Sequence, residues 1–195
     1  KMVVAVSILG NPCSIEVIRN FCDKHGLYLL EDNCESMGAE LNGKLCGTFG
    51  DIGTFSTFFS HHISTIEGGI ILTENEEIFH LMKSLRAHGW TRDLPYDSSI
   101  YGRGEDDFYE AYRFILPGYN LRPLELSGAI GREQIKRLPE MTAQRRENLK
   151  LFQNLFGDDD RFIIQQEYGE SSAFSFTIIL NPEAGIDRQK VFDEL

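Results

Sequence analysis

The sequence predicts an α/β fold built on a mainly parallel sheet. The apolar run at residues 3–9 is typical of a buried strand, and Gly10–Asn11–Pro12 ends it. Ser14 then stands where a helix N-cap belongs, and apolar residues recur at helical spacing up to His25–Gly26. A second strand at 27–30 follows at once. A strand, helix and strand of this length indicate a right-handed crossover between parallel strands.

Two further strands follow after a short polar segment. Asn42–Gly43 is the usual tip of a small hairpin. Apolar runs at 52–58 and 70–73 predict the strands, and Asn75 can cap a helix that ends near Ala87. The first half of the chain therefore alternates strands and helices.

The second half begins with a long segment at 88–107 that shows no clean periodicity, and loops of this length are often functional. Pro123 is expected to open a helix with apolar residues at helical spacing. Pro139 is expected to start a second, charge-rich helix that runs to Phe156.

A change of pattern near Gly157–Asp160 suggests a domain boundary, because strand-like runs at 162–166 and 173–180 follow it. We expect residues 1–157 to form part of a larger domain and 158–195 the start of a small α+β domain. The chain opens inside an apolar run and closes inside a helical one, so we expect it to be an internal piece of a longer protein.

Composition narrows the class of partner. A net charge of −11 disfavours nucleic acids, whose phosphates need clustered Lys and Arg. The first residues show no signal peptide, and no apolar stretch is long enough to cross a bilayer. Four scattered cysteines lack the spacing of a zinc knuckle. We expect a cytoplasmic protein with reduced thiols, no metal and no membrane partner.

Polar residues gather where the predicted strands end, which is where ligands bind in open α/β sheets. Asp32 could form a cap or a salt bridge, or it could hold the protonated ring nitrogen of a pyridoxal-type cofactor. Glu35 lies one turn later and could share its face or simply be exposed. Ser56 could bond to backbone or to a phosphate.

His61 and His62 follow the strand at 52–58. We expect one of these adjacent side chains to face a site and the other to turn away. A neutral imidazole near a cofactor is a suitable general base. The pair is a poor metal site because the sequence offers no obvious third ligand nearby.

The order of these residues resembles the DegT/DnrJ/EryC1 family of sugar aminotransferases and dehydratases, which use vitamin B6 and have fold type I. Its pattern is an Asp in an EDxxxxxGA run, a Ser at a strand end, a Lys five residues later, Glu-Gly-Gly, and later RxHG and GYNxRxxExxAA segments. The segments that match are EDNCESMGA at 31–39, Ser56, His61, Glu67–Gly69, RAHGW at 86–90 and PGYNLRPLELSGAIG at 117–131.

The resemblance implies a three-layer αβα arrangement and pyridoxal 5'-phosphate or pyridoxamine 5'-phosphate as cofactor. It places Asp32 at the ring nitrogen, Glu35 over or beside the ring, and Ser56 at the phosphate. It also implies a homodimer with shared active sites. Asn120 would contact the phosphate of the neighbouring subunit's cofactor, and the remaining matched residues of the long loop, His88 and Arg92, would reach the substrate.

The lysine position of the family holds His61, and histidine cannot form the covalent link to the cofactor. One branch of the family shows the same replacement, namely the 3-dehydratases of nucleotide-linked 4-keto-6-deoxy sugars. By that resemblance His61 is the catalytic base, it assists loss of the C3 hydroxyl, and glutamate regenerates the cofactor amine.

Two such dehydratases differ in their need for iron. The one that acts on a CDP-sugar carries an iron–sulfur cluster, which needs four cysteines that are usually close together in sequence. Here no cysteine follows Cys46. The resemblance therefore favours the branch that acts on GDP-linked 4-keto-6-deoxymannose in 3-deoxy sugar and O-antigen synthesis. A sugar aminotransferase and a non-catalytic piece of the fold remain the alternatives.

Overall fold

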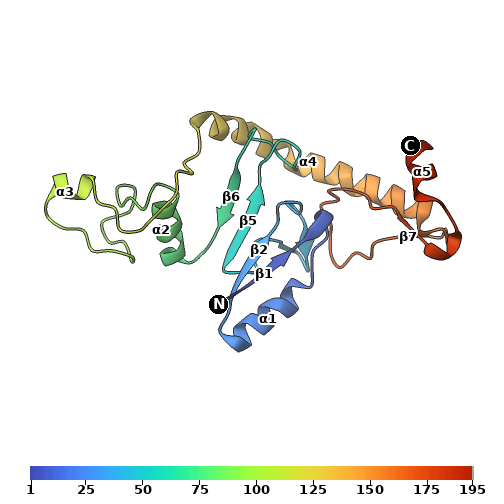
Figure 1. The fold of residues 1–195 in the computed structure, drawn as a ribbon, viewed down its shortest axis with the longest axis horizontal. Coiled ribbons are helices and arrows are strands. Elements are labelled where there is room, and N and C mark those ends of the chain that lie inside the picture. The colour runs from blue at the N-terminus through green and yellow to red at the C-terminus, as the bar shows by residue number, and fades with distance from the viewer. Residues whose placement is uncertain (195) are drawn as a thin grey trace.

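The computed structural model describes residues 1–194, and its centre is a four-stranded sheet (Figure 1). The strands stand in the order β1 (Met2–Val6), β2 (Tyr28–Asp32), β5 (Ile52–Ser56) and β6 (Gly69–Leu72). The first three are parallel, whereas β6 runs antiparallel to β5. The α/β fold with a mainly parallel sheet is therefore confirmed.

Helix α1 (Ile15–His25) joins β1 to β2 and covers one face of the sheet. Gly26 ends the helix with φ +60°, as predicted from its residue type. Ser14 occupies the N-cap position, but its side chain makes no capping bond, and its carbonyl instead accepts the N–H of Val17. The predicted N-cap position is therefore confirmed.

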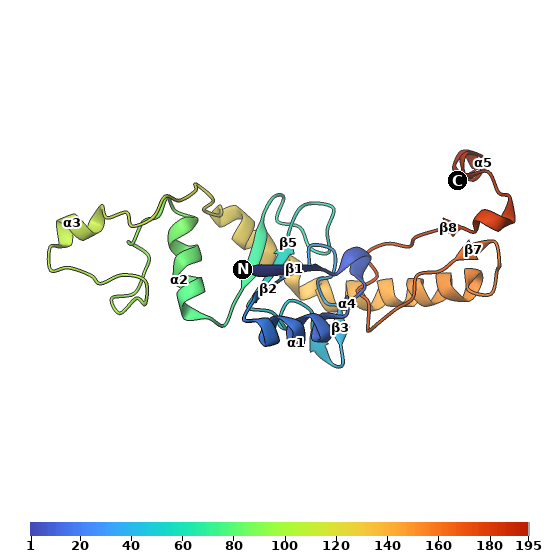
Figure 2. The ribbon, with the colours of Figure 1, turned by 60° about the horizontal axis from the view of Figure 1, so that its bottom comes forward.

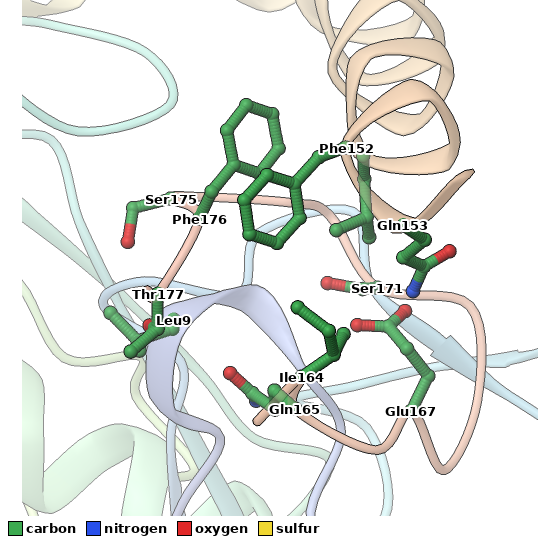
Figure 3. A pocket seen from close by; sticks show the side chains of 11 residues that line it. Leu9, Phe152, Gln153, Ile164, Gln165, Glu167, Ser171, Ser175, Phe176 and Thr177 are labelled. Atoms are coloured by element: carbon green, nitrogen blue, oxygen red, sulfur yellow. The ribbon is translucent and has the colours of Figure 1, made fainter. Parts of the chain in front are cut away.

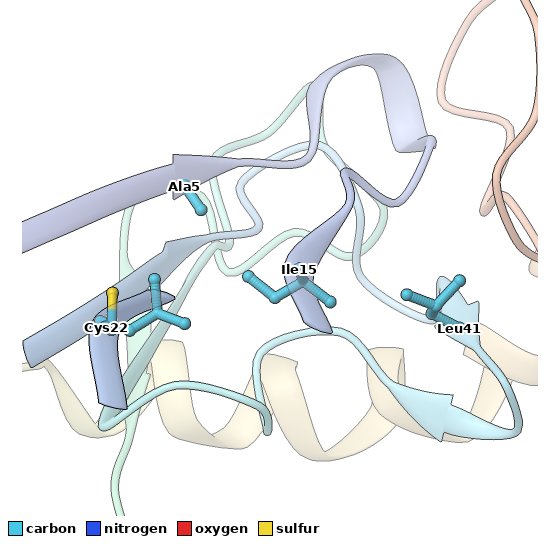
Figure 4. Packing of buried hydrophobic residues seen from close by; sticks show 5 residues of the cluster. Ala5, Ile15, Cys22 and Leu41 are labelled. Carbon is cyan, nitrogen blue, oxygen red and sulfur yellow. The ribbon is translucent and has the colours of Figure 1, made fainter. Parts of the chain in front are cut away.

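The core lies between α1 and the sheet (Figure 4). Apolar side chains at helical spacing on α1 meet alternate residues of the parallel strands, and burial of such groups is the main stabilising contribution to a domain. On the opposite face, Val4 remains 53% exposed. The cluster consists of Ala5, Ile15, Cys22, Leu29 and Leu41.

Two predictions from short sequence motifs are confirmed, one in the small hairpin and one at the start of the next helix. The hairpin pairs β3 (Glu40–Leu41) with β4 (Lys44–Leu45), and Asn42 and Gly43 both have positive φ at its tip. Asn75 caps α2 (Glu76–Leu85) by accepting the N–H of Ile78 over 3.0 Å.

A small helix that the sequence did not predict follows the long loop. This is α3 (Asp107–Ala111), and the side chain of Asp106 caps it by accepting the N–H groups of Phe108 and Tyr109. Figure 1 shows α3 and the loop as an arm beyond α2.

Helix α4 (Glu125–Phe156) is one continuous helix that contains Pro139, so the prediction of two helices was wrong. Proline fixes φ near the helical value and removes only one N–H donor, so a helix can pass through it at a cost. Contacts on both sides hold this helix in place, since Gly131 approaches Thr65 and Thr142 lies against Gly38. Figures 1 and 2 show α4 crossing the end of the sheet toward which β5 points.

The last elements are β7 (Phe162–Ile163), β8 (Ile179–Leu180), the 3-10 turn η2 (Pro182–Ala184) and α5 (Arg188–Glu194). Both strands are shorter than predicted, because residues 164–178 between them, here called the returning segment, run back and bond their backbone to the β3–β4 hairpin. Glu170 exchanges two backbone hydrogen bonds with Glu40, at 2.8 and 2.9 Å. The domain boundary at residue 158 stays a prediction.

Among the helices of residues 1–194, none combines the length and the apolar character that a transmembrane span requires.

Candidate functional site

Two neighbouring parallel strands end in the polar residues that the sequence singled out. Asp32 is the last residue of β2 and Ser56 the last of β5, and Asp32 pairs in register with Thr54. The pairing continues past the strand end, because the N–H of Asn33 donates to the carbonyl of Thr54 over 2.8 Å. The structure thus places Asp32 and Ser56 at the same edge of the sheet, as predicted.

The acidic pair at the end of β2 divides into two different environments. Glu31 is 2% exposed and accepts three N–H groups, from Gly47 (2.7 Å), Phe49 (2.6 Å) and Gly50 (2.6 Å). Asp32 is only half-buried, and its Oδ1 accepts the N–H of Cys34 over 3.1 Å. Among the hydrogen bonds of residues 1–194, Oδ2 of Asp32 accepts none. Glu31 is saturated, whereas Asp32 keeps one oxygen for a ligand.

The thiol next to this carboxylate is not a nucleophile at neutral pH. Burial is the main cause that raises the pKa of Cys34 to about 11, and the negative charge of Asp32 acts in the same direction. Cys34 therefore stays a neutral thiol beside Asp32.

The loop after β5 brings His61 to the same edge. Oγ of Ser56 accepts the N–H of Phe58 over 3.2 Å, and the carbonyl of Phe58 accepts the N–H of His61 over 3.0 Å. The ring of His61 lies 5.8 Å from that of Phe58 and 5.5 Å from that of Phe174. Its Nδ1 is buried, and within residues 1–194 it has no hydrogen-bond partner. An imidazole nitrogen with free capacity is what proton transfer needs.

His62 turns away from His61 into the protein and is 2% exposed. Its Nε2 lies 2.9 Å from the carbonyl of Glu35 and 3.1 Å from Oγ of Ser172, and its Nδ1 meets the guanidinium of Arg145. Burial is the main cause that lowers the pKa of His62 to about 4, and the charge of Arg145 acts in the same direction. The two histidines therefore face different surroundings, as the sequence suggested.

Glu35 points toward the N-terminal side of the site. Its Oε2 accepts the N–H of Leu9 over 2.8 Å, and Leu9 lies in the 3-10 turn η1 (Ile8–Gly10) with φ +55°. A positive φ is costly for a leucine, so this hydrogen bond helps to hold a strained turn. Glu35 thus already has a protein partner, which Oδ2 of Asp32 lacks.

The other three predicted residues lie together at the base of the arm. Asn120 and Ala87 form an isolated antiparallel β-bridge, and the N–H of His88 donates to the carbonyl of Tyr119 over 2.7 Å. The guanidinium of Arg92 lies 5.0 Å from the centre of the Trp90 ring. Within residues 1–194, no hydrogen bond or ion pair joins this group to the residues at the strand ends. The structure therefore shows two separate groups of candidate residues.

Two hollows in the structure lie away from the residues at the strand ends. One of about 10 Å³ lies between α4 and the returning segment, beside Phe152 and Phe176 (Figure 3), and it has room for about one water. The other, about 260 Å³, lies on the arm and is lined by Trp90, Arg92, Arg103, Asp107, Glu110, Ala111 and Tyr112. Only the second shares a residue with the predicted site, namely Arg92.

The strand-end group fits the cofactor that the resemblance implies. A carboxylate oxygen of Asp32 is free for a protonated ring nitrogen, the hydroxyl of Ser56 can still donate to a phosphate, and Nδ1 of His61 is unbonded. The residues present therefore match the chemical demands of a pyridine ring that carries a phosphate.

The sequence did not point to Arg145, Ser172 or Phe174. Their contacts with the two histidines join positions 83 to 113 residues apart, so neither spacing nor periodicity could reveal them. The only available signal was the adjacency of the two histidines, which required separate surroundings for each ring.

Several known proteins are similar to this chain in sequence and fold. It is 50% identical over its whole length to GDP-4-keto-6-deoxy-D-mannose 3-dehydratase of Yersinia pseudotuberculosis, and the match covers 50% of that protein. The E. coli enzyme of that name, solved with bound hydrated PLP, is 48% identical with a TM-score of 0.95 over 100% of this chain and 50% of that one. A GDP-4-keto-6-deoxymannose-3-dehydratase variant with bound GDP-perosamine gives the same identity and TM-score over 100% and 51%.

The chain spans about half the length of the curated relatives it matches. The profile of the DegT/DnrJ/EryC1/StrS aminotransferase family matches residues 1–195, which is the whole sequence. The chain belongs to the DegT/DnrJ/EryC1/StrS aminotransferase family.

Proposed function

We propose that the protein containing this chain is a pyridoxamine-phosphate-dependent 3-dehydratase of a nucleotide-linked 4-keto-6-deoxyhexose. The observation that carries this proposal is a histidine, His61, with an unbonded ring nitrogen where other members of the family have a lysine. Histidine can move a proton but cannot form the covalent link that transamination through lysine requires. The 50% identity to a GDP-4-keto-6-deoxy-D-mannose 3-dehydratase supports GDP-4-keto-6-deoxymannose as the substrate.

The residues at the strand ends would each have a separate role in this reaction. Asp32 would hold a proton on the ring nitrogen of the cofactor through Oδ2, and the hydroxyl of Ser56 would donate to its phosphate. When bound, pyridoxamine phosphate supplies an amine for the C4 ketone of the sugar and a ring that accepts electrons. His61 would take up a proton at a ring nitrogen and return it to the departing C3 hydroxyl. Glu35 would lie beside the ring, and glutamate would renew the amine.

The second group of residues suggests how the whole protein assembles. His88, Arg92 and Asn120 lie apart from the strand ends and are exposed at the base of the arm. We therefore propose a homodimer in which this group completes the site of the partner subunit, with Asn120 at the cofactor phosphate and the other two residues at the sugar. The four cysteines, all free, support a cytoplasmic location.

The test uses two variants of the full-length protein, His61→Asn and Arg92→Met, alone and co-expressed. His61→Asn is expected to lower turnover of GDP-4-keto-6-deoxymannose by about 10³-fold, because general acid–base catalysis contributes that much. Arg92→Met should lower kcat/KM at least about tenfold through loss of a charged contact. If sites are shared, one of the two sites in each mixed dimer is intact, so the co-expressed pair should recover about a quarter of wild-type activity.

The control is His25→Asn, an exposed position on α1, which should leave activity unchanged. Wild-type turnover in the His61→Asn variant would disprove the proposed function. Recovery no greater than the residual activity of Arg92→Met alone would disprove the shared site without affecting the role of His61.

A further inference from the structure

We propose that Arg145 and His62 are positioning residues that fix His61 and leave it as the one proton-transferring imidazole of the adjacent pair. This inference rests on the proposed function, since it concerns the base of that reaction. The contacts that carry it join α4, the loop after β5, the segment after β2 and the returning segment near Ser172.

The tautomer of His62 follows from its partners. Arginine can only donate hydrogen bonds, so Nδ1 of His62 must accept from Arg145. The proton of a neutral ring then resides on Nε2, where the carbonyl of Glu35 accepts it over 2.9 Å. Oγ of Ser172, 3.1 Å from Nε2, lies close to the same proton. Both ring nitrogens are therefore engaged, and rotation of the ring would break two or three bonds together.

The loop that carries both histidines is also closed by hydrogen bonds at its neck, which consists of Thr57 and Thr65. The N–H of Thr65 donates to the carbonyl of Thr57 over 2.8 Å, and the two hydroxyls lie 2.7 Å apart. The backbone of His61 thus lies between a fixed neck and the anchored ring of His62. A catalytic group that is held in one orientation before the reaction loses less entropy in the transition state, so the barrier to proton transfer is lower.

The returning segment supplies a common wall for the two rings. The ring of Phe174 lies 5.5 Å from that of His61 and 5.4 Å from that of His62. Its backbone position depends on Gly10, which has φ +88°, because a Cβ there would come within 2.7 Å of the N atom of Phe174. Phe174 therefore couples the orientation of the catalytic ring to that of the anchored one.

The surroundings of His62 also keep it neutral. Burial lowers its pKa to about 4, and the positive charge of Arg145 opposes protonation further. At neutral pH His62 therefore does not compete with its neighbour for the reacting proton. The hydrogen bond to the carbonyl of Glu35 and the charge of its carboxylate both act in the opposite direction, but burial outweighs them.

The experiment compares Arg145→Met and Arg145→Lys with Arg137→Met, an exposed position on the same helix, in the full-length protein. Arg145→Met should lower kcat by about 10- to 100-fold with KM within about twofold, the cost of a small misplacement of a catalytic group. Arg145→Lys keeps a donor and should recover most of kcat. Ring-nitrogen NMR of ¹⁵N-histidine protein should show His62 as the Nε2–H tautomer in the wild type and as a mixture in Arg145→Met.

A wild-type His62 with its proton on Nδ1 would overturn the proposed network, whatever the activity. A change in KM alone, or a kcat equal to that of Arg137→Met, would overturn the positioning role. A wild-type protein without dehydratase activity would refute the proposed function instead, and the NMR spectrum would still decide the tautomer.

Discussion

Glu31 and Asp32 are consecutive carboxylates at the end of β2, and the two-residue period of a strand sends them to opposite faces. Glu31 holds the turn before β5 through three N–H groups, whereas Asp32 keeps a free oxygen at the edge of the sheet. The same side-chain chemistry therefore serves structure at one position and leaves an oxygen without a bond at the next.

Glu31→Gln should lower the free energy of unfolding by about 3 kcal/mol. A glutamine has one carbonyl oxygen, so at least one of the three buried N–H groups loses its acceptor, and its amide group faces donors. Urea denaturation measures the difference. Asp32→Asn is the matched control and should change stability by less than about 1 kcal/mol, because Asp32 accepts a single bond that asparagine can keep. An equal effect of both variants would contradict the division of roles.

At the scale of elements, α4 is the part that joins the loop after β5 to the returning segment. Its residues Arg145 and Arg146 bind the loop after β5 and the returning segment, respectively. Arg146 donates to the carbonyls of Ser171 and Gly38, so the helix also joins the segment after β2. These contacts all come from the part of the helix that follows Pro139.

Pro139→Ala should raise the free energy of unfolding by about 1–3 kcal/mol, because alanine restores the N–H donor and suits a helix interior far better than proline. Thermal unfolding followed by circular dichroism provides the measurement. Glu140→Ala, at the next exposed position, is the control and should change stability by less than about 0.5 kcal/mol. A destabilised Pro139→Ala variant would mean that the packing of α4 on the loops requires the bend that a proline brings.

At the scale of the whole molecule, the anchored His62 makes stability depend on pH. Its pKa falls from the ordinary 6.5 to about 4 in the folded chain, so between these values the unfolded chain binds more protons. The contribution of His62 is fully present above pH 6.5 and is lost as the pH falls toward 4. The full loss corresponds to about 3 kcal/mol, at 1.36 kcal/mol for each pH unit.

His62→Gln should remove this dependence, because glutamine keeps a donor for the Glu35 carbonyl but does not titrate. Urea unfolding free energies at pH 4.5 and 7 should therefore differ by about 2 kcal/mol less in the variant than in the wild type, because part of the full loss occurs only below pH 4.5. His25→Asn, which removes an exposed histidine, is the control and should keep the wild-type dependence. An unchanged dependence in His62→Gln would assign the acid sensitivity to other groups.

Features governed by short-range interactions were predictable from the sequence. The cap at Asn75, the turn at Asn42–Gly43 and the helix end at Gly26 each depend on a few neighbouring residues. The strand end near Asp32 followed from the apolar run before it, whereas Ser56 as a strand end followed from the family resemblance, since the apolar run predicted a strand over 52–58.

Features that depend on distant contacts were not predictable. The antiparallel direction of β6 and the short β7 and β8 are set by the partners that their backbones find. Pro139 is a breaker by local rules, yet packing on both sides of it keeps α4 continuous.

The sequence by itself determined the α/β class, the crossover, the strand-end residues and the family, because local propensity and the order of motifs encode them. Only the tertiary structure decided which carboxylate keeps a free oxygen and which histidine is anchored. Those distinctions arise from contacts across 16 to 110 residues, such as Glu31 with Gly47 and His62 with Ser172. A buried polar atom is defined by the partners that folding brings to it, and chain order does not specify them.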